Sequence, residues 1–166
     1  MTIEQTLVLI KPDGVVRCLS GRIISRFEDA GLKIVAMKMA WVDNELAGKH
    51  YRKDIAEKYG ERVRNGLIEY IKEGPVLAMV LEGVNAIKNI RKIVGSTYPD
   101  ESLPGTIRGD FAHISKDYAN KHEINVRNLI HASSNQEDAK IEIPLWFNKK
   151  EIHSYKTGHD MICLGK

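Results

Sequence analysis

The segment PVLAMVLE at Pro75–Glu82 predicts the clearest buried strand of the chain, because it is apolar until its last residue. QTLVLI at Gln5–Ile10 predicts a second strand, which ends at the turn signal KPDG, Lys11–Gly14. KIVAMKMAW at Lys33–Trp41 partly alternates between apolar and polar residues and predicts a third strand. Val126–His131 predicts the fourth.

Apolar residues at helical spacing fill the segments between these strands. Helices are predicted from Gly21 to Ala30, from Asp43 or Asn44 through Tyr51, over Ile55–Lys72 and Asn85–Val94, and from a capping box at Ser134–Glu137 to about Phe147. The resulting order is β-α-β-β-α-β with extra helices, which is the split, ferredoxin-like pattern of the α+β class. We expect a four-stranded antiparallel sheet covered by helices on one face, with a long functional loop at Ser96–Asp110.

The composition is that of a globular protein, with 43% hydrophobic and 28% charged residues. Its 166 residues suit one domain, and we expect residues 1–166 to form it. No stretch approaches the roughly 20 apolar residues of a membrane helix. Cys18 and Cys163 match no metal or redox spacing, so we expect reduced thiols in a cytoplasmic protein. A net charge of only +3 gives little evidence for nucleic-acid binding.

Phosphate chemistry in this chain would have to rely on side chains, because neither a P-loop nor a G-x-G-x-x-G fingerprint is present. Lys11 follows a strand directly and precedes a turn, but a solvated lysine at a turn is the simpler interpretation. Arg91 and Arg108 are each ordinary surface arginines unless they converge with Lys11 on one pocket, where their planar guanidinium groups would suit phosphate oxygens. If they are ligands, alanine at either arginine should impair turnover more than folding.

His131 lies at the end of a predicted strand and just before a helix N-terminus, where free N–H groups favour anions. A histidine there could be a nucleophile toward phosphorus, a general base or a buried polar residue. Glu142 and Ser133 could orient its ring. The other five histidines form no metal-binding pattern, so no protein-held metal is expected.

Six longer segments stand in order along nearly the whole chain: TLVLIKPDGVVR (Thr6–Arg17), GRIISRFEDAGLKIVAMKM (Gly21–Met39), KHY (Lys49–Tyr51), GPVLAMVLEG (Gly74–Gly83), PGTIRGDF (Pro104–Phe111) and NLIHASS (Asn128–Ser134). EIPLWF at Glu142–Phe147 follows them. Together these segments, with their N-x-x-H pattern at Asn128–His131, resemble the nucleoside diphosphate kinase family.

The resemblance implies a ping-pong transfer of the γ-phosphate from a nucleoside triphosphate to a nucleoside diphosphate, with His131 as the nucleophile that becomes phosphohistidine. It places Glu142 and Ser133 where they orient the imidazole and Tyr51 beside the transferring group. It further implies contacts to nucleotide and phosphates from Lys11, Arg91, Thr97, Arg108 and Asn128. Mg²⁺ is expected to arrive on the nucleotide. The resemblance also implies a homohexamer, with a tetramer as the alternative.

The chain departs from the family pattern at three places. Val63 aligns where the family has a base-stacking aromatic residue, and Tyr59 is the alternative contact. Ser134 stands where the family often has aspartate. Extra residues occupy roughly Ser115–Asn125. A non-catalytic nucleotide- or RNA-binding module on the same fold is the competing hypothesis, although the RNP1 pattern of such modules is absent.

Overall fold

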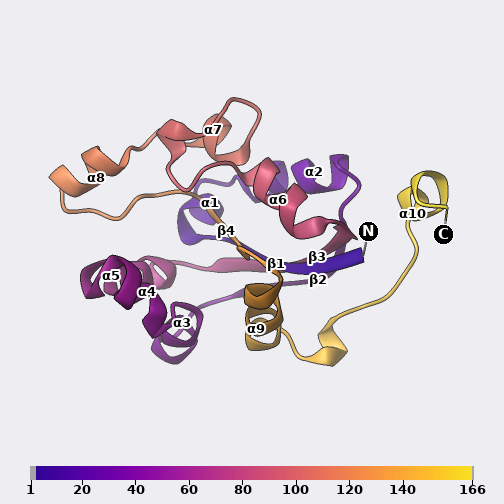
Figure 1. Ribbon diagram of the computed structural model, residues 1–166, viewed down its shortest axis with the longest axis horizontal. Coiled ribbons are helices and arrows are strands. Elements are labelled where there is room, and N and C mark those ends of the chain that lie inside the picture. Colours follow the sequence, from indigo (N-terminus) through magenta and orange to yellow (C-terminus); the bar gives the residue numbers. More distant parts are fainter. Residues whose placement is uncertain (1–2, 166) are drawn as a thin grey trace.

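The computed structural model describes residues 3–165 and has one four-stranded antiparallel sheet at its centre (Figure 1). Its strands are β1 (Ile3–Ile10), β2 (Lys33–Ala40), β3 (Val76–Val84) and β4 (Ile130–Ala132). They lie in the order β2-β3-β1-β4, and every neighbouring pair is antiparallel. This is the predicted ferredoxin-like arrangement, so the sequence-based fold class is confirmed.

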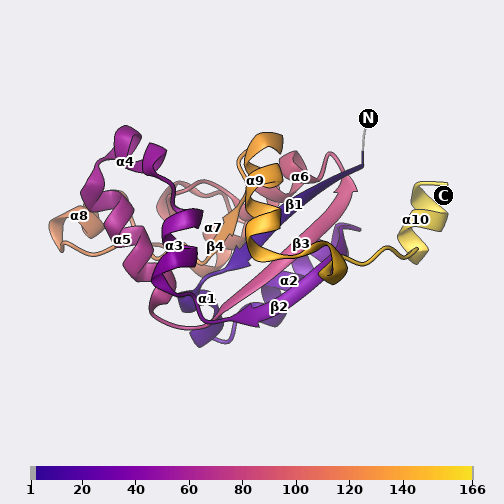
Figure 2. The ribbon, with the colours of Figure 1, turned by 90° about the horizontal axis from the view of Figure 1, so that it is seen from below.

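Helices cover both faces of the sheet, so the expectation that they cover one face is wrong (Figures 1 and 2). The helices are α1 (Pro12–Val16), α2 (Ser20–Asp29), α3 (Asn44–His50), α4 (Lys53–Tyr59), α5 (Glu61–Lys72), α6 (Ala86–Val94), α7 (Ile107–Phe111), α8 (Lys116–Lys121), α9 (Gln136–Trp146) and α10 (Gly158–Cys163). Two short 3₁₀ turns, η1 (Pro99–Glu101) and η2 (Lys149–Glu151), complete the elements. The extra helices α3, α5 and α9 close the second face.

Strand β1 explains why two covering layers are needed. Val8 and Ile10 pack into the cluster formed with α2 and α6, whereas Leu7 and Leu9 pack into the cluster formed with α3, α5 and α9. Successive side chains of a strand point to opposite faces, so an uninterrupted apolar run requires cover on both sides. All four side chains are fully buried.

Two predicted elements are divided or shifted. The helix predicted over Ile55–Lys72 is broken at Gly60, whose φ of 92° ends α4 and begins α5 in a conformation that glycine adopts most readily. The capping box predicted at Ser134 is replaced by a simple N-cap one residue later, where the Asn135 side chain accepts a hydrogen bond from the Asp138 N–H.

Three segments predicted as loop or left unassigned contain helix. The turn after Lys11 is the first turn of α1, with Pro12 at its first position. The long loop at 96–110 contains η1 and the start of α7. The extra residues near 115–125 form α8, whose N-cap is Ser115. Beyond α9, an extended segment leads to α10 (Figure 1). None of the helices described is long and apolar enough to cross a membrane.

Candidate active site

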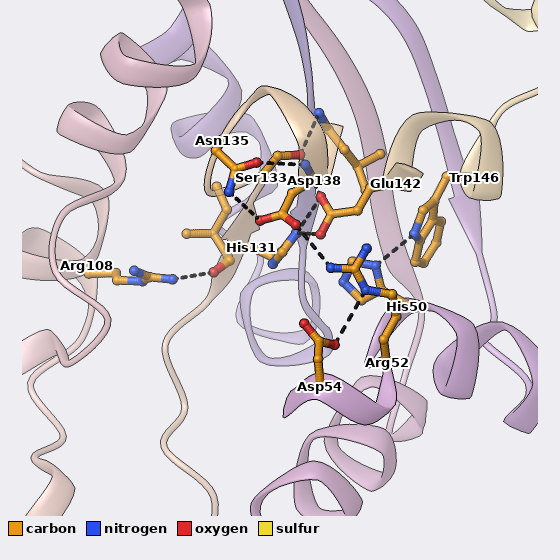
Figure 3. Close-up of polar contacts among 12 residues, drawn as sticks. His50, Arg52, Asp54, Arg108, His131, Ser133, Asn135, Asp138, Glu142 and Trp146 are labelled. Atoms are coloured by element: carbon orange, nitrogen blue, oxygen red, sulfur yellow. Dashed lines mark hydrogen bonds and ion pairs between the residues drawn. The ribbon is translucent and has the colours of Figure 1, made fainter. Parts of the chain in front are cut away.

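His131 lies in the middle of β4, beside β1, and its side chain is 21% exposed. Its Nε2 atom is 3.1 Å from both carboxylate oxygens of Glu142 on α9 (Figure 3). Ser133 donates a 2.6 Å hydrogen bond to the same carboxylate, and its own main chain pairs with Leu7 of β1. The structure therefore brings together the three residues that the sequence grouped, and it directs Nε2, rather than Nδ1, toward the acid.

The Glu142 carboxylate stays ionised in this setting. Burial raises its pKa, but attraction to His131, the hydrogen bond from that ring and the bond from Ser133 outweigh burial and lower the pKa to about 2. A carboxylate accepts hydrogen bonds and donates none, so the Nε2 atom of His131 carries the proton. In the neutral form of this ring, Nδ1 is then the nitrogen with the free lone pair.

His50 is a site residue that the sequence analysis did not select. Its ring, at the end of α3, meets the His131 ring edge-on at 4.6 Å between centroids. Trp146 Nε1 donates to His50 Nδ1 over 3.3 Å, and Figure 3 shows the two rings side by side. Burial, followed by repulsion from His131, lowers the pKa of His50 to about 3, so the ring is neutral. Only its place in the KHY segment, beside Tyr51, could have suggested it.

Lys11 is buried at the end of β1, and its Nζ donates a 2.8 Å hydrogen bond to Asn128 Oδ1. Asn128 in turn donates from Nδ2 to the main-chain oxygen of Thr97. Burial lowers the pKa of Lys11 to about 7, and repulsion from Arg108 adds to the effect. Lys11, Asn128 and the main chain of Thr97 thus form one connected group, and their contacts to a nucleotide stay a prediction.

The segment before β4 carries unusual backbone, and this shortens the strand predicted from Val126. Leu129 has a φ of +67°, a region that branched and bulky residues rarely adopt, and so the ladder begins only at Ile130. The Leu129 N–H donates to Asp13 Oδ2, and the Leu129 carbonyl accepts from the Lys11 N–H over 2.8 Å. Such strain persists only where the surroundings enforce it.

Arg108 supplies much of that enforcement. Its guanidinium donates to the main-chain oxygens of Asn128 and Ile130, on either side of Leu129, and to those of Gly95 and Ser96. These four bonds account for four of the five N–H groups of the side chain. The main role of the Arg108 side chain is therefore structural, because it links the β4 segment to the loop after α6. One of its N–H groups remains for another acceptor.

We expect Arg108→Ala to lower the free energy of unfolding by roughly 3 kcal/mol or more, because several buried carbonyls lose their donor. This replaces the sequence-based expectation that turnover would suffer more than folding. Urea denaturation followed by circular dichroism measures the change. Arg91→Ala is the matched control and should stay within about 0.5 kcal/mol, since Arg91 is an exposed residue of α6. Equal stabilities for the two variants would contradict this structural role of Arg108.

Arg91 contributes charge at the edge of the site. Burial lowers the pKa of Arg108 to about 10, and repulsion from Arg91 is the next cause, which places these two cations near each other. Arg91 and Ser134 also line a common pocket of about 570 Å³. Lys11, Arg108 and Arg91 thus act on one another electrostatically in sequence, Lys11 with Arg108 and Arg108 with Arg91. Their convergence on one phosphate-binding pocket stays a prediction.

Tyr51 closes the site on the side of α3. It is buried, its hydroxyl has no hydrogen-bond partner among residues 3–165, and burial raises its pKa. Arg64 of α5 donates to the Tyr51 carbonyl over 2.8 Å and so fixes its backbone. The Tyr51 ring meets the His50 ring edge-on at 4.8 Å between centroids, and its hydroxyl is protonated. Val63 and Tyr59, the two candidates for base contact, lie exposed on the α4–α5 hairpin, and their role stays a prediction.

Within the described part of the chain, one group of side chains could bind a metal ion. Donor atoms of His50, His131 and Glu142 lie within 4.8 Å of one another there. His131 and Glu142 are already bonded to each other. The expectation that the protein holds no metal of its own stays a prediction.

Fold and site together define a class: an α+β protein with a histidine oriented by a carboxylate and with the buried cations Lys11 and Arg108 bonded to the adjoining segment, a combination suited to phosphoryl transfer. The model of the family described as nucleoside diphosphate kinase matches residues 4–152. This chain belongs to the nucleoside diphosphate kinase family.

Relatives agree over nearly their whole length. The nucleoside diphosphate kinase of Borreliella burgdorferi is 49% identical over 157 residues, covering 94% of both chains, and that of Pyrococcus furiosus is 49% identical over 158 residues, covering 95% of this chain and 91% of its own. A solved structure of the Borrelia burgdorferi enzyme, a transition-state mimic with vanadate and ADP, has a TM-score of 0.93 at 48% identity and covers 95% of each chain. The Halobacterium salinarum enzyme in complex with CDP has a TM-score of 0.81 at 36% identity, covering 96% of this chain and 97% of its own.

Proposed function

We propose that this protein transfers the γ-phosphate of ATP or another nucleoside triphosphate to a nucleoside diphosphate, through a phosphohistidine on His131. Family membership supports the reaction class, nucleoside diphosphate kinase phosphotransfer. The observation that carries the residue assignment is the contact of His131 Nε2 with both oxygens of Glu142, which leaves Nδ1 free to attack. The related Borrelia structure holds ADP and vanadate, which fits the same chemistry.

The reaction proceeds in two matched halves. Nδ1 of His131 forms a bond to the γ-phosphorus while the bond from that phosphorus to the β–γ bridging oxygen breaks, and the nucleoside diphosphate leaves with the electron pair. Positive charge that develops on the ring is stabilised by the Glu142 carboxylate, which Ser133 holds in place. In the second half a terminal oxygen of another nucleoside diphosphate attacks the phosphorus, and the N–P bond breaks.

Charged and polar side chains around His131 hold the phosphates in this proposal. Lys11 and Tyr51 stabilise the transferring group, because one is a buried ammonium and the other a buried hydroxyl without a partner in the described chain. The remaining phosphate and ribose contacts are assigned to Arg91, Thr97, Arg108 and Asn128. Arg108 has one N–H to offer, so we assign most of its binding role to the shape of the loop that it fixes.

Mg²⁺ is proposed to arrive on the nucleotide phosphates and to neutralise their charge when bound. Glu142, the carboxylate beside His131, already accepts contacts on both oxygens, so we assign it to the imidazole and not to the ion.

We also propose a cytoplasmic homo-oligomer, a hexamer with a tetramer as the alternative. Apolar side chains exposed along β2 and its end, at Met37, Met39 and Trp41, support self-association. That residues 1–166 form one domain stays a prediction.

The test of the proposed function is a γ-phosphate exchange assay with GDP as acceptor. Initial rates at several fixed GDP concentrations should give parallel double-reciprocal lines, because the triphosphate leaves as diphosphate before the acceptor binds. Chelating Mg²⁺ with EDTA should abolish exchange. Intersecting lines would indicate direct transfer within a ternary complex and would contradict a phosphohistidine relay. Binding of GDP with no exchange at all would support the competing hypothesis of a non-catalytic module.

A further inference from the structure

Tyr70 of α5 is a fully buried aromatic residue outside the set assigned to the reaction. Its hydroxyl lies near the Asp13 carboxylate. Burial, followed by the nearby Asp13 carboxylate, raises its pKa, so the hydroxyl is protonated. Its ring lies beside Lys11, the cation assigned to the transferring group.

Two cations lie against the Tyr70 ring. Lys11 Nζ is 4.8 Å from the ring centroid, and the Arg127 guanidinium carbon is 4.5 Å from it. Arg127 is tied to the end of the same helix by an ion pair with Glu73, in which Nη2 donates to Oε1 over 2.8 Å. Both distances are within the roughly 6 Å range of a cation–π contact. Helix α5 thus holds an aromatic face against the buried lysine.

The Lys11 ammonium has few other supports. Asn128 Oδ1 accepts its one hydrogen bond within the described chain. Burial, Arg108 and Arg127 all oppose the charged form, while Asp13 on α1 favours it, and His50 on α3 is near but neutral. The negative face of an aromatic ring attracts a desolvated ammonium. The Tyr70 ring therefore gives the Lys11 ammonium a favourable contact in a place where the neighbouring cations Arg108 and Arg127 repel it.

We propose that Tyr70 is a positioning residue that holds the Lys11 ammonium, charged and oriented, between its ring face and the Asn128 side chain for phosphoryl transfer. This inference rests on the proposed role of Lys11 in the reaction. The aromatic face, rather than the hydroxyl, carries the effect, because the contact that the structure provides to Lys11 is to the ring.

The experiment compares three replacements at position 70 by their pH profiles of kcat/KM for ATP. Tyr70→Phe keeps the ring and should stay within about threefold of the parent. The alkaline limb of this profile is the decline in kcat/KM that we expect as Lys11 loses its proton, since its pKa is lowered to about 7. Tyr70→Met removes the ring while filling its space, and should move this limb down by about 0.4 to 1.5 pH units. That range is the free energy of a cation–π contact converted to a change in the pKa of Lys11. A 3,4,5-trifluorophenylalanine at position 70 keeps the shape of phenylalanine but weakens the negative face, and should shift the limb in the same direction.

Rates are normalised to the number of sites that excess ATP phosphorylates, so a partly unfolded variant does not distort the result. The fluorinated variant keeps the test decisive even if Tyr70→Met fails to fold. An unmoved limb in the fluorinated variant would overturn the inference. A Tyr70→Phe profile as disturbed as that of Tyr70→Met would also overturn it, because the hydroxyl and Asp13 would then be the acting groups.

Lys11→Met separates this inference from the proposed function. If that variant keeps full activity, the proposed role of Lys11 is wrong, and the inference falls with it. If Lys11→Met is inactive while the variants at Tyr70 keep the parent limb, only the inference is wrong.

Discussion

His131→Gln should lose nucleotide exchange by a factor on the order of 10⁴ or more, because the chemical step has no other nucleophile to pass through. Glutamine has no basic ring nitrogen, but its amide can still donate to Glu142, so the fold should be kept. Incubation with γ-labelled ATP and Mg²⁺ should label the parent protein with an acid-labile, base-stable phosphate. The variant should remain unlabelled.

The matched control is His153→Gln, which changes an exposed histidine beyond the residues that match the family model. It should label and exchange like the parent. Labelling that survives in His131→Gln would transfer the intermediate to another residue. His50 would then be the first to examine, because its ring contacts that of His131.

Lys11→Met should lower kcat by about 10²- to 10³-fold, the usual effect of removing a fixed charge that stabilises a transition state. The variant should fold at least as well as the parent, since it removes a buried cation that burial and Arg108 already disfavour. Stopped-flow quench measurement of the first phosphorylation by ATP isolates this step from product release.

The pH dependence gives the same prediction a second readout. The pKa of Lys11 is lowered to about 7, so the ammonium form prevails below that pH and is lost as the pH rises through it. For the parent, kcat/KM for ATP, which reports the free enzyme, should therefore decline above about pH 7. Lys11→Met should lack this decline, and Lys11→Arg, whose guanidinium keeps its charge, should move it to higher pH. An alkaline decline that persists unchanged in Lys11→Met would assign it to another group.

Much of the fold follows from local sequence patterns. The apolar runs at Gln5–Ile10 and Pro75–Glu82 have strong β-propensity and clear turn signals, and both became central strands. The places where prediction failed are those where backbone geometry depends on distant contacts. The strand predicted from Val126 starts at Ile130, because Arg108, Asp13 and Lys11 hold the preceding Leu129 at a positive φ.

The site divides in the same way. The sequence could group His131, Glu142 and Ser133 because they stand in motifs close to one another along the chain. His131 lies on β4, Ser133 directly follows that strand, and Glu142 lies on α9. Tyr70 could not be identified, and His50 only through its place in the KHY segment, because nothing else near them in the sequence distinguishes a packed aromatic residue from one that contacts His131 or Lys11. Only the packing of α3 and α5 against the sheet brings their rings to His131 and Lys11.

The sequence by itself determined the order of strands and helices, the chemical groups available and the family, since these depend on residue type and spacing along the chain. The tertiary structure alone decided which groups are desolvated, which ring nitrogen is free and which arginine is already committed to carbonyl oxygens. The physical reason is that burial and hydrogen-bond pairing depend on residues about 10 to 120 positions apart in the chain, and these meet only when the sheet and its two helical layers have assembled.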